Sequence, residues 1–228
     1  MTAYLLRARG LRARAPFLAG VLLAMMVFVV PAKATEKSGP DVEAAVRFVT
    51  ELVDQAMAVL RNDELTTQER DAQLSTLLRA GFALDYISRF VLGRHWRKAT
   101  PEQRQDYRSL FTDFIINTYS ARLDEYHEET VKIGTGQAVG KRDVLVESNI
   151  VQRDAPPIPV EWRVRYRKNE FKVIDLKVEG ISMAISQREE FSAVIQKKGI
   201  DGLIDSLRQK VMNPPTKQAA AQDTTGGS

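Results

Sequence analysis

Apolar residues recur at steps of three or four between residues 41 and 126, which is the spacing of helices that bury one face. The pattern predicts four helices, over residues 41–60, 66–81, 85–92 and 101–126. The last is the longest, and its apolar positions are Tyr107, Leu110, Phe111, Phe114, Ile115, Thr118, Tyr119, Leu123 and Tyr126. This broad apolar face, with charged residues on the other side, indicates that the helix packs against the rest of the protein.

Residues that favour helix ends stand at several of these boundaries. Gly93 follows the third helix and can take the left-handed conformation that ends a helix. Thr100 and Gln103 have the spacing of a capping box at the start of the fourth helix. Thr66 and Glu69 repeat that spacing before the second helix. The chain around Gly93 therefore predicts a helix, a corner and the start of the next helix.

Beyond residue 129 the period of the apolar positions changes to two, the alternation of strands with one buried face. Four strands are predicted, over residues 130–133, 143–150, 160–167 and 171–179. The segment 134–140 is glycine-rich and predicts a loop between the first two. In the last strand the apolar set shifts phase between Val173 and Ile174, which indicates a β-bulge that would curve the sheet.

Two more helices are expected after the strands. Ser186 and Glu189 have capping-box spacing before one of them, and Asp201 begins the other. Helices, then antiparallel strands, then helices predict an α+β fold in which several helices pack on one curved antiparallel sheet. Without internal repeats or an interior linker, residues 35–212 are expected to form a single domain, and residues 213–228 a disordered tail.

The first 34 residues have the pattern of a cleaved signal peptide. Four arginines precede an apolar run from Phe17 to Val30, and Ala32-Lys33-Ala34 supplies the small residues of a cleavage site. A membrane anchor is the alternative, but 14 residues fall short of the roughly 20 that a spanning helix needs. We therefore expect cleavage after Ala34 and export of the chain from Thr35 onward.

Cleavage changes what the charge of the chain implies. The full sequence has 33 Lys and Arg against 29 Asp and Glu, an excess that could suggest a nucleic-acid partner. Five of the cations and none of the acids lie in residues 1–34, which leaves 28 against 29 and a net charge of −1. We expect no nucleic-acid partner. The chain has no cysteine, so disulfides cannot stabilise the fold.

Each catalytic or metal-binding motif that this sequence approaches is incomplete. The only histidines are His95 and His127, and neither belongs to a metal-ligand motif. Residues 180–184 approach the G-x-S-x-G nucleophile motif, but no histidine follows Ser182. Residues 134–141 are one residue too long for a phosphate-binding loop and lack its Ser or Thr. We expect no enzyme, no metal site and no cofactor.

Two segments carry a resemblance to a known family. One covers residues 91–104 and continues through Thr118-Tyr119 to residues 123–126; the other covers residues 175–183, Phe191 and residues 198–203. Their order and spacing resemble the MlaC family, periplasmic phospholipid carriers that are also described as toluene-tolerance proteins. His95 and Phe171 depart from the family pattern, where an aromatic residue and a tryptophan are expected.

The resemblance implies a periplasmic carrier that shuttles glycerophospholipids and so maintains the lipid asymmetry of the outer membrane. Its implied partners are an outer-membrane lipoprotein–porin complex and the periplasmic substrate-binding subunit of an inner-membrane ABC transporter. It also implies a monomer whose sheet and helices enclose an apolar pocket for the acyl chains. Periodicity alone leaves a packed core and a cavity both open. The expected lipid-binding residues are Val91, Phe111, Phe114, Ile115, Tyr119, Val146, Val164, Tyr166, Leu176, Val178, Ile181 and Met183.

Other functions remain open at this point. The same fold could carry a different hydrophobic molecule, such as a hopanoid or a quinone. It could also be a lipid-free periplasmic adaptor that bridges membrane complexes. An esterase that acts on lipids is disfavoured by the missing histidine after Ser182.

Overall fold

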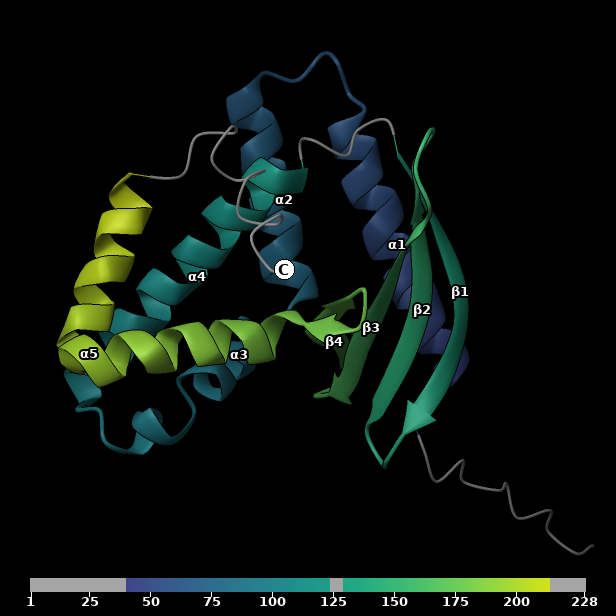
Figure 1. Ribbon diagram of the computed structural model, residues 1–228. Coiled ribbons are helices and arrows are strands. Elements are labelled where there is room, and N and C mark those ends of the chain that lie inside the picture. The colour runs from purple at the N-terminus through teal and green to yellow at the C-terminus, as the bar shows by residue number, and fades with distance from the viewer. Residues whose placement is uncertain (1–39, 124–128, 214–228) are drawn as a thin grey trace, which may run out of the picture. The chain divides into compact units, whose positions relative to one another are not determined.

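The computed structural model describes residues 40–123 and 129–213 (Figure 1). The helices of this part are α1 (Val42–Leu60), α2 (Thr67–Gly81), α3 (Leu84–Leu92), the short 3₁₀ helix η1 (Gly93–Arg97), α4 (Pro101–Leu123) and α5 (Met183–Met212). Its strands are β1 (Thr130–Val139), β2 (Asp143–Val151), β3 (Ile158–Arg167), β4 (Glu170–Val178) and β5 (Ile181–Ser182). The expected α+β fold is confirmed. Within the described residues, no helix is long and apolar enough to span a bilayer.

Two of the three predicted capping boxes are present. The backbone N–H of Glu69 donates to the Thr66 hydroxyl over 3.3 Å, and the Glu69 carboxylate accepts from the Thr66 N–H over 2.9 Å. The same reciprocal pair joins Thr100 and Gln103, at 3.2 and 3.0 Å. Gly93 ends α3 with a φ of +55°, as expected. These caps satisfy backbone donors that the first turn of a helix leaves without partners.

The five strands form one antiparallel sheet in the order β1-β2-β3-β4-β5, and the sheet is curved. The predicted bulge is present in β4: Val173 pairs with Val164 and Asp175 with Arg163, so Ile174 is the extra residue. A bulge increases the local twist and bends the strand that carries it. The phase shift in the sequence therefore located the bend correctly.

The predicted loop at residues 134–140 is wrong for most of its length, because β1 continues to Val139. Its pairing with β2 shifts register between Ile133 and Gly136, which disguises the alternation in the sequence. A side chain at Gly136 would place its Cβ 2.8 Å from methyl carbons of Val42 and Val46. Glycine here lets α1 approach the strand closely, and the apparent loop signal reflects that contact.

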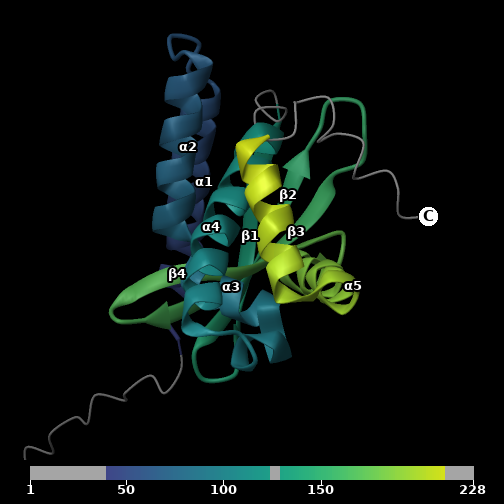
Figure 2. The ribbon, with the colours of Figure 1, turned by 90° about the vertical axis from the view of Figure 1, so that its left-hand side faces the viewer.

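The last two predicted helices follow one another within α5, and the first of them begins earlier than expected. Ser182, not Ser186, is the N-cap of α5: its hydroxyl accepts from the N–H of Ile185 over 3.1 Å. At Gly199 the backbone leaves the helical region, with φ +73° and ψ −178°. The bend divides α5 into two limbs, residues 183–198 and 200–212, and the second limb lies beside α4 (Figure 2).

The buried apolar residues form two separate clusters. One joins α3, α4 and both limbs of α5 around Tyr107 and Phe111, which are fully buried, and we call it the helical cluster. The other packs α1 against the middle of the sheet, and we call it the α1–sheet cluster; its buried members are Ala45, Val49, Val53, Val144, Val146 and Val164. The Tyr107 hydroxyl donates to the Ser88 carbonyl over 3.0 Å, which satisfies its only polar atom inside the helical cluster.

Candidate functional site

Four of the predicted lipid-binding residues lie in or against the helical cluster. Val91, Phe111 and Phe114 are buried there, and Ile115 packs against them from the edge. The rings of Phe111 and Phe114 lie 6.2 and 6.1 Å from the ring of Phe191 on α5, within the range of favourable aromatic pairs. The structure thus places this group in contact with α5.

Val146 and Val164 lie on the face of the sheet that α1 covers. Both are completely buried in the α1–sheet cluster. Val144 pairs with Val164 across β2 and β3, and Val146 pairs with Trp162. The side chains of the predicted set on β2 and β3 therefore meet the methyl groups of α1.

A further group lies on the same face of the sheet but away from the middle of α1, which contacts β1 and β2. Leu176 pairs with Trp162 and Val178 pairs with Val160, so these side chains share one face of β3 and β4. Leu176, Val178 and Trp162 are half-buried, and only Trp162 reaches the α1–sheet cluster. We call this set of four residues the apolar seam.

Val160 and Trp162 were not among the predicted lipid-binding residues. Their alternation was visible in the sequence, but the register that pairs them with β4 was not. The polar groups of the seam are satisfied: the Trp162 Nε1–H donates to the Ser148 hydroxyl over 2.8 Å, and that hydroxyl donates to the Val160 carbonyl over 3.4 Å. Such pairing is needed for polar atoms on an otherwise apolar face.

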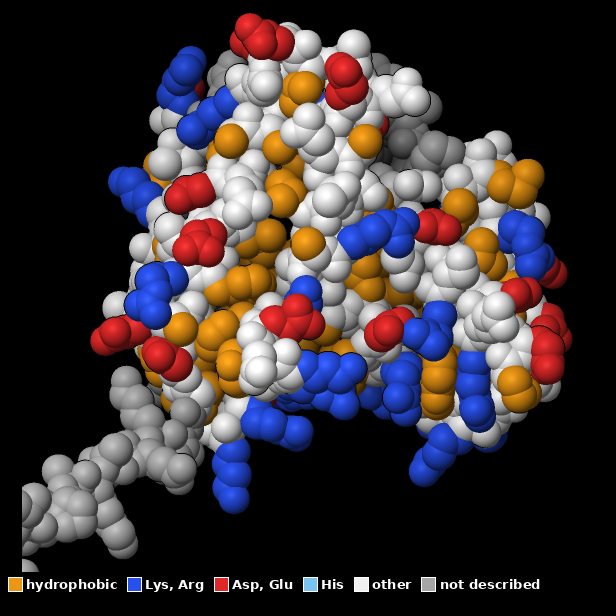
Figure 3. Space-filling model, turned by 180° about the vertical axis from the view of Figure 1, so that it is seen from behind, with side chains coloured by type: hydrophobic (Ala, Val, Ile, Leu, Met, Phe, Trp, Pro, Cys, Tyr) orange, Lys and Arg blue, Asp and Glu red, His pale blue; other side chains and the backbone are white. Residues whose placement is uncertain are grey.

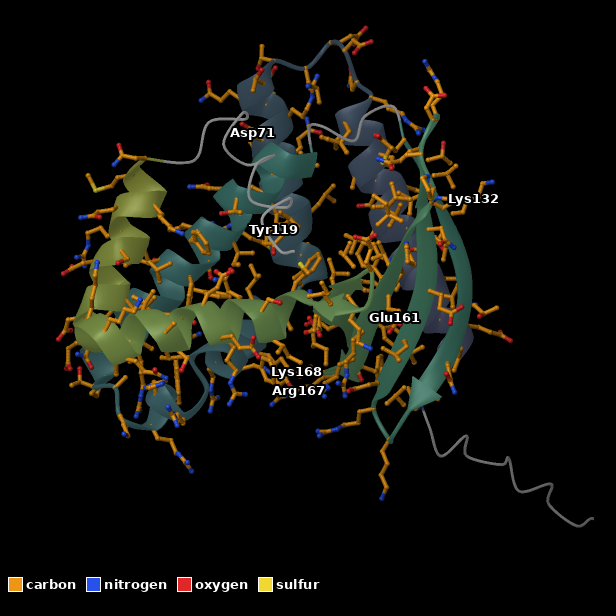
Figure 4. The ribbon with its side chains drawn as sticks, viewed as in Figure 1. Asp71, Tyr119, Lys132, Glu161, Arg167 and Lys168 are labelled. Carbon is orange, nitrogen blue, oxygen red and sulfur yellow. The ribbon has the colours of Figure 1, made fainter. Side chains whose placement is uncertain are left out.

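Tyr119 is a half-buried residue near the end of α4 (Figure 4). Residues four apart on a helix advance by about 40° around its axis, so Phe111, Ile115 and Tyr119 turn progressively away from a common direction. Their burial follows this drift, since Phe111 is fully buried and the other two are half-buried. The three residues are thus less uniform in position than their spacing alone suggests.

Space-filling atoms show a recess near the middle of the face in Figure 3, with apolar side chains inside it. No buried residue belongs to both apolar clusters. The helical cluster and the α1–sheet cluster are therefore separate groups of packed side chains.

Three predicted residues lie near or at the surface. Tyr166 is 43% exposed and Ile181 is 59% exposed, while Met183 is half-buried. The backbone around Ile181 is held firmly by hydrogen bonds of Ser182, whose hydroxyl donates to Asp175 over 2.6 Å. The Asp175 carboxylate also accepts from the N–H of Ala184 over 3.1 Å. An exposed apolar side chain on such a fixed corner suits the rim of a site better than its interior.

A polar cavity of about 300 Å³ lies elsewhere, between α2, α3 and α4. It is lined by Arg79, Asp85, Gln105, Arg108, Ser109, Thr112 and Asp113. Ion pairs join Arg79 to Asp113 and Arg108 to Asp85 within it. None of the predicted lipid-binding residues contributes to this lining, and its charges do not suit acyl chains.

Ser182 and the two histidines are the residues that come nearest to a catalytic or metal-binding motif in the sequence. Ser182 caps α5, as described above, and His127 lies outside the described residues. His95 lies in η1, where its Nε2 is buried without a hydrogen-bond partner among the described residues. Burial, and then the charges of nearby cations, lower the pKa of His95 below its usual value. Within residues 40–123 and 129–213, no three potential metal ligands converge.

Comparison with known proteins confirms the resemblance found in the sequence. Residues 50–209 match the family model of the MlaC protein. The intermembrane phospholipid transport system binding protein MlaC of Haemophilus influenzae is 24% identical over 191 residues, which cover 82% of this chain and 83% of the relative. The toluene tolerance protein ttg2D of Pseudomonas putida is 27% identical over 139 residues, covering 60% and 64%.

A solved structure supports the fold as well. The phospholipid-binding protein from Ralstonia solanacearum, determined in complex with a phospholipid, superposes with a TM-score of 0.66 at 25% sequence identity. The match covers 74% of this chain and 97% of that protein. Nearly the whole of the phospholipid-bound protein therefore has a counterpart here.

Proposed function

Because this chain belongs to the MlaC family, we propose that it is a carrier that binds glycerophospholipids and transports them between membranes. The observation that carries the proposal is the match to almost the full length of a protein solved with a phospholipid bound. The names of the Haemophilus and Pseudomonas relatives support the same role. The carrier would exchange lipid with an outer-membrane lipoprotein–porin complex and with the periplasmic subunit of an inner-membrane ABC transporter.

The acyl chains are assigned to the space between the helical cluster and the apolar seam. Tyr119 and Ile115 would contact them from α4, and Leu176 and Val178 from β4. Ile181, at the rim, would lie near the point where the chains enter. This assignment rests on the half-buried apolar side chains that neither cluster encloses. The remaining predicted residues would support these walls from behind.

The energetics of acyl chains favour exchange at docked membranes over release into water. Each methylene removed from water contributes about 0.8 kcal/mol. Two chains of about 16 carbons would therefore favour the bound state by more than about 20 kcal/mol before entropic costs are counted. Spontaneous release would be very slow at that cost, so a partner has to provide an apolar path. The carrier function thus requires docking partners as well as a pocket.

The central experiment identifies what the protein carries after export. The protein is purified from the periplasm without detergent and analysed by native mass spectrometry, followed by lipid extraction. We expect bound glycerophospholipid in a fixed ratio to protein. A hopanoid or quinone in its place would establish the alternative cargo, and a folded protein without any lipid would establish the adaptor.

A second experiment tests the assigned walls. A photo-crosslinking amino acid replaces Tyr119 or Leu176 in protein that carries its cellular lipid, and each variant is irradiated. We expect lipid adducts at both positions. The control replaces Lys132, which is exposed on β1 and is not one of the predicted lipid-binding residues. Adducts that form at the control and not at the two wall positions would place the lipid elsewhere.

Export itself is tested separately. We propose that the mature protein begins at Thr35 and is released into the periplasm after cleavage of residues 1–34. The intact mass of protein recovered by osmotic shock should match a chain that begins at Thr35. Retention of the uncleaved chain in the membrane fraction would contradict this assignment without bearing on lipid binding.

A further inference from the structure

Cationic side chains gather at one end of the described structure, at which η1 and the turns of the β1–β2 and β3–β4 hairpins lie (Figure 1). Figure 3 shows them along the lower edge of its face. We call this set the basic band, and it consists of Arg89, Arg94, Arg97, Lys98, Arg142, Arg167, Lys168 and Arg188. All eight are exposed. None of them pairs with a carboxylate of residues 40–123 or 129–213.

Contacts on the sheet side of the band join the two hairpin turns to α3. The N–H of Tyr166 donates to the carbonyl of Arg142 over 3.2 Å, which brings the β1–β2 turn beside the end of β3. The Arg165 guanidinium lies 4.8 Å from the ring of Tyr86 on α3. Arg167 and Lys168 follow at the tip of the β3–β4 turn (Figure 4). This half of the band is therefore held in place by backbone and stacking contacts.

Contacts on the helical side continue the band from α3 to η1 and α5. The guanidinium groups of Arg89 and Arg104 lie 5.2 and 5.5 Å from the ring of Trp96. Arg188 of α5 lies 5.4 Å from the ring of Phe90. Stacking of this kind orients guanidinium groups without neutralising their charge. The cations on this side remain available to an external anion.

The concentration of charge is local and does not reflect a basic protein. The chain from Thr35 onward carries 28 cations and 29 acids, yet eight of those cations lie at this one end without an acidic partner among the described residues. Mutual repulsion of like charges disfavours such an arrangement in the folded state. An anionic surface that approaches this end would relieve that repulsion.

We propose that the basic band adsorbs the protein to the surface of an anionic lipid bilayer. The band spreads over five elements or turns, which suits a broad anionic surface better than a small ligand. Exposed tyrosines lie among the cations: Tyr86 is 37% exposed and Tyr166 is 43% exposed. Tyrosine and tryptophan beside basic residues favour the bilayer–water interface. This inference goes beyond the carrier function and does not depend on it.

The test measures adsorption of the mature protein to sedimented vesicles. One set of vesicles contains phosphatidylcholine with roughly 30% phosphatidylglycerol, and the other contains phosphatidylcholine alone. Each cation at a membrane surface changes the partition coefficient by about fivefold. The double variant Arg94→Gln/Arg167→Gln removes one cation from each half of the band, so its partition to anionic vesicles should fall by roughly 20- to 30-fold.

The matched control removes two exposed cations outside the band, Lys132 on β1 (Figure 4) and Lys210 on the second limb of α5. We expect Lys132→Gln/Lys210→Gln to adsorb within about twofold of the wild type. Adsorption should also weaken as salt rises to about 0.5 M, because salt screens exposed charges. Circular dichroism checks that both double variants are folded.

Three outcomes would overturn the proposal. They are equal adsorption to neutral and anionic vesicles, equal losses in the two double variants, and no adsorption by the wild type. The last result would leave an acidic protein as the partner of the band. Bound lipid is quantified in the same preparations. A protein that carries phospholipid but does not adsorb to vesicles would refute the role of the basic band and leave the carrier function standing.

Discussion

Gly199 forms the bend of α5, and its backbone conformation is the basis of a sharp stability prediction. A φ of +73° with a ψ of −178° belongs to a region that only glycine occupies readily. A Cβ added at this position would meet no atom within 4 Å. Gly199→Ala therefore perturbs the backbone without a steric clash. Its cost would come from conformation alone.

Two responses to this substitution are possible, and their energies decide between them. If the bend persists, alanine occupies a strained conformation at a cost of about 1 to 3 kcal/mol. If α5 straightens, alanine gains about 1 kcal/mol over glycine in a helix. The second limb would then leave the helical cluster with Leu203, Ile204 and Leu207, which are at most 5% exposed. Burial of three such side chains contributes about 5 to 9 kcal/mol, so the strained bend should persist.

We expect Gly199→Ala to lower the free energy of unfolding by about 1 to 3 kcal/mol. For a protein of this size, that loss lowers the Tm by roughly 2 to 12 °C. Urea unfolding followed by circular dichroism measures the first quantity, and thermal melting measures the second. Lys197→Ala, at an exposed position in the regular part of the first limb, should stay within about 0.5 kcal/mol of the wild type.

A result outside this range would identify the faulty step. If Gly199→Ala is as stable as the wild type, alanine adopts the bend without strain or the bend is absent. Both would refute the argument from backbone conformation. A loss above about 5 kcal/mol would mean that the second limb detaches, and the energy comparison would then be wrong.

Three further predictions concern single residues. Ile181→Asp should reduce bound phospholipid per folded protein while lowering the Tm little, because Ile181 is exposed; an early melt with unchanged lipid content would contradict its place at the rim. Asp143→Asn should lower the stability at pH 7 by roughly 1 to 3 kcal/mol and flatten its loss below pH 4. Burial raises the Asp143 pKa, but hydrogen bonds from Arg165 and Arg163 lower it overall. Asp143 therefore stabilises the fold above the pKa that it has in the unfolded chain, and this stabilisation is lost as the pH falls. If the stability of the variant and of the wild type changes with pH in the same way, the prediction is wrong. Because the pKa of His95 is lowered in the fold, protonation below about pH 6.5 favours the unfolded chain. His95→Phe should therefore lose less stability than the wild type between about pH 7.5 and 5.5, as measured by urea unfolding. Equal losses in the two proteins would contradict the prediction.

The sequence predicted helix starts well where the signal is local and less well where the partner is distant. Thr66 with Glu69, and Thr100 with Gln103, place a cap within three residues, and both were correctly assigned. The start of α5 was placed late because Ser182 is supported by Asp175, which lies on β4. Capping-box spacing from Ser186 looked equally good in isolation. Only the pairing of β4 with β5 distinguishes the two positions.

The glycines of residues 134–140 led to a wrong loop prediction, because their distant neighbours are not visible in the sequence. In the segment 134–140, glycine suggested a loop, although Gly136 lies in a paired strand. Its lack of a side chain serves contact with Val42 and Val46, almost a hundred residues earlier. A local reading cannot distinguish a glycine that frees the backbone from one that admits a neighbouring helix. The bulge at Ile174 was predicted because it leaves a phase shift within one strand.

The candidate site shows why apolar periodicity identifies a face more readily than a pocket. Phe111 and Leu176 both occupy apolar faces, yet Phe111 meets Phe191 and is fully buried, whereas Leu176 pairs with Trp162 and stays half-buried. The difference arises because α5 returns to cover α4, whereas α1 contacts mainly β1 and β2. A chain with one continuous core would enclose that half-buried surface. Two separate clusters leave it between them, and an acyl chain is an occupant that would complete the burial without adding a polar group.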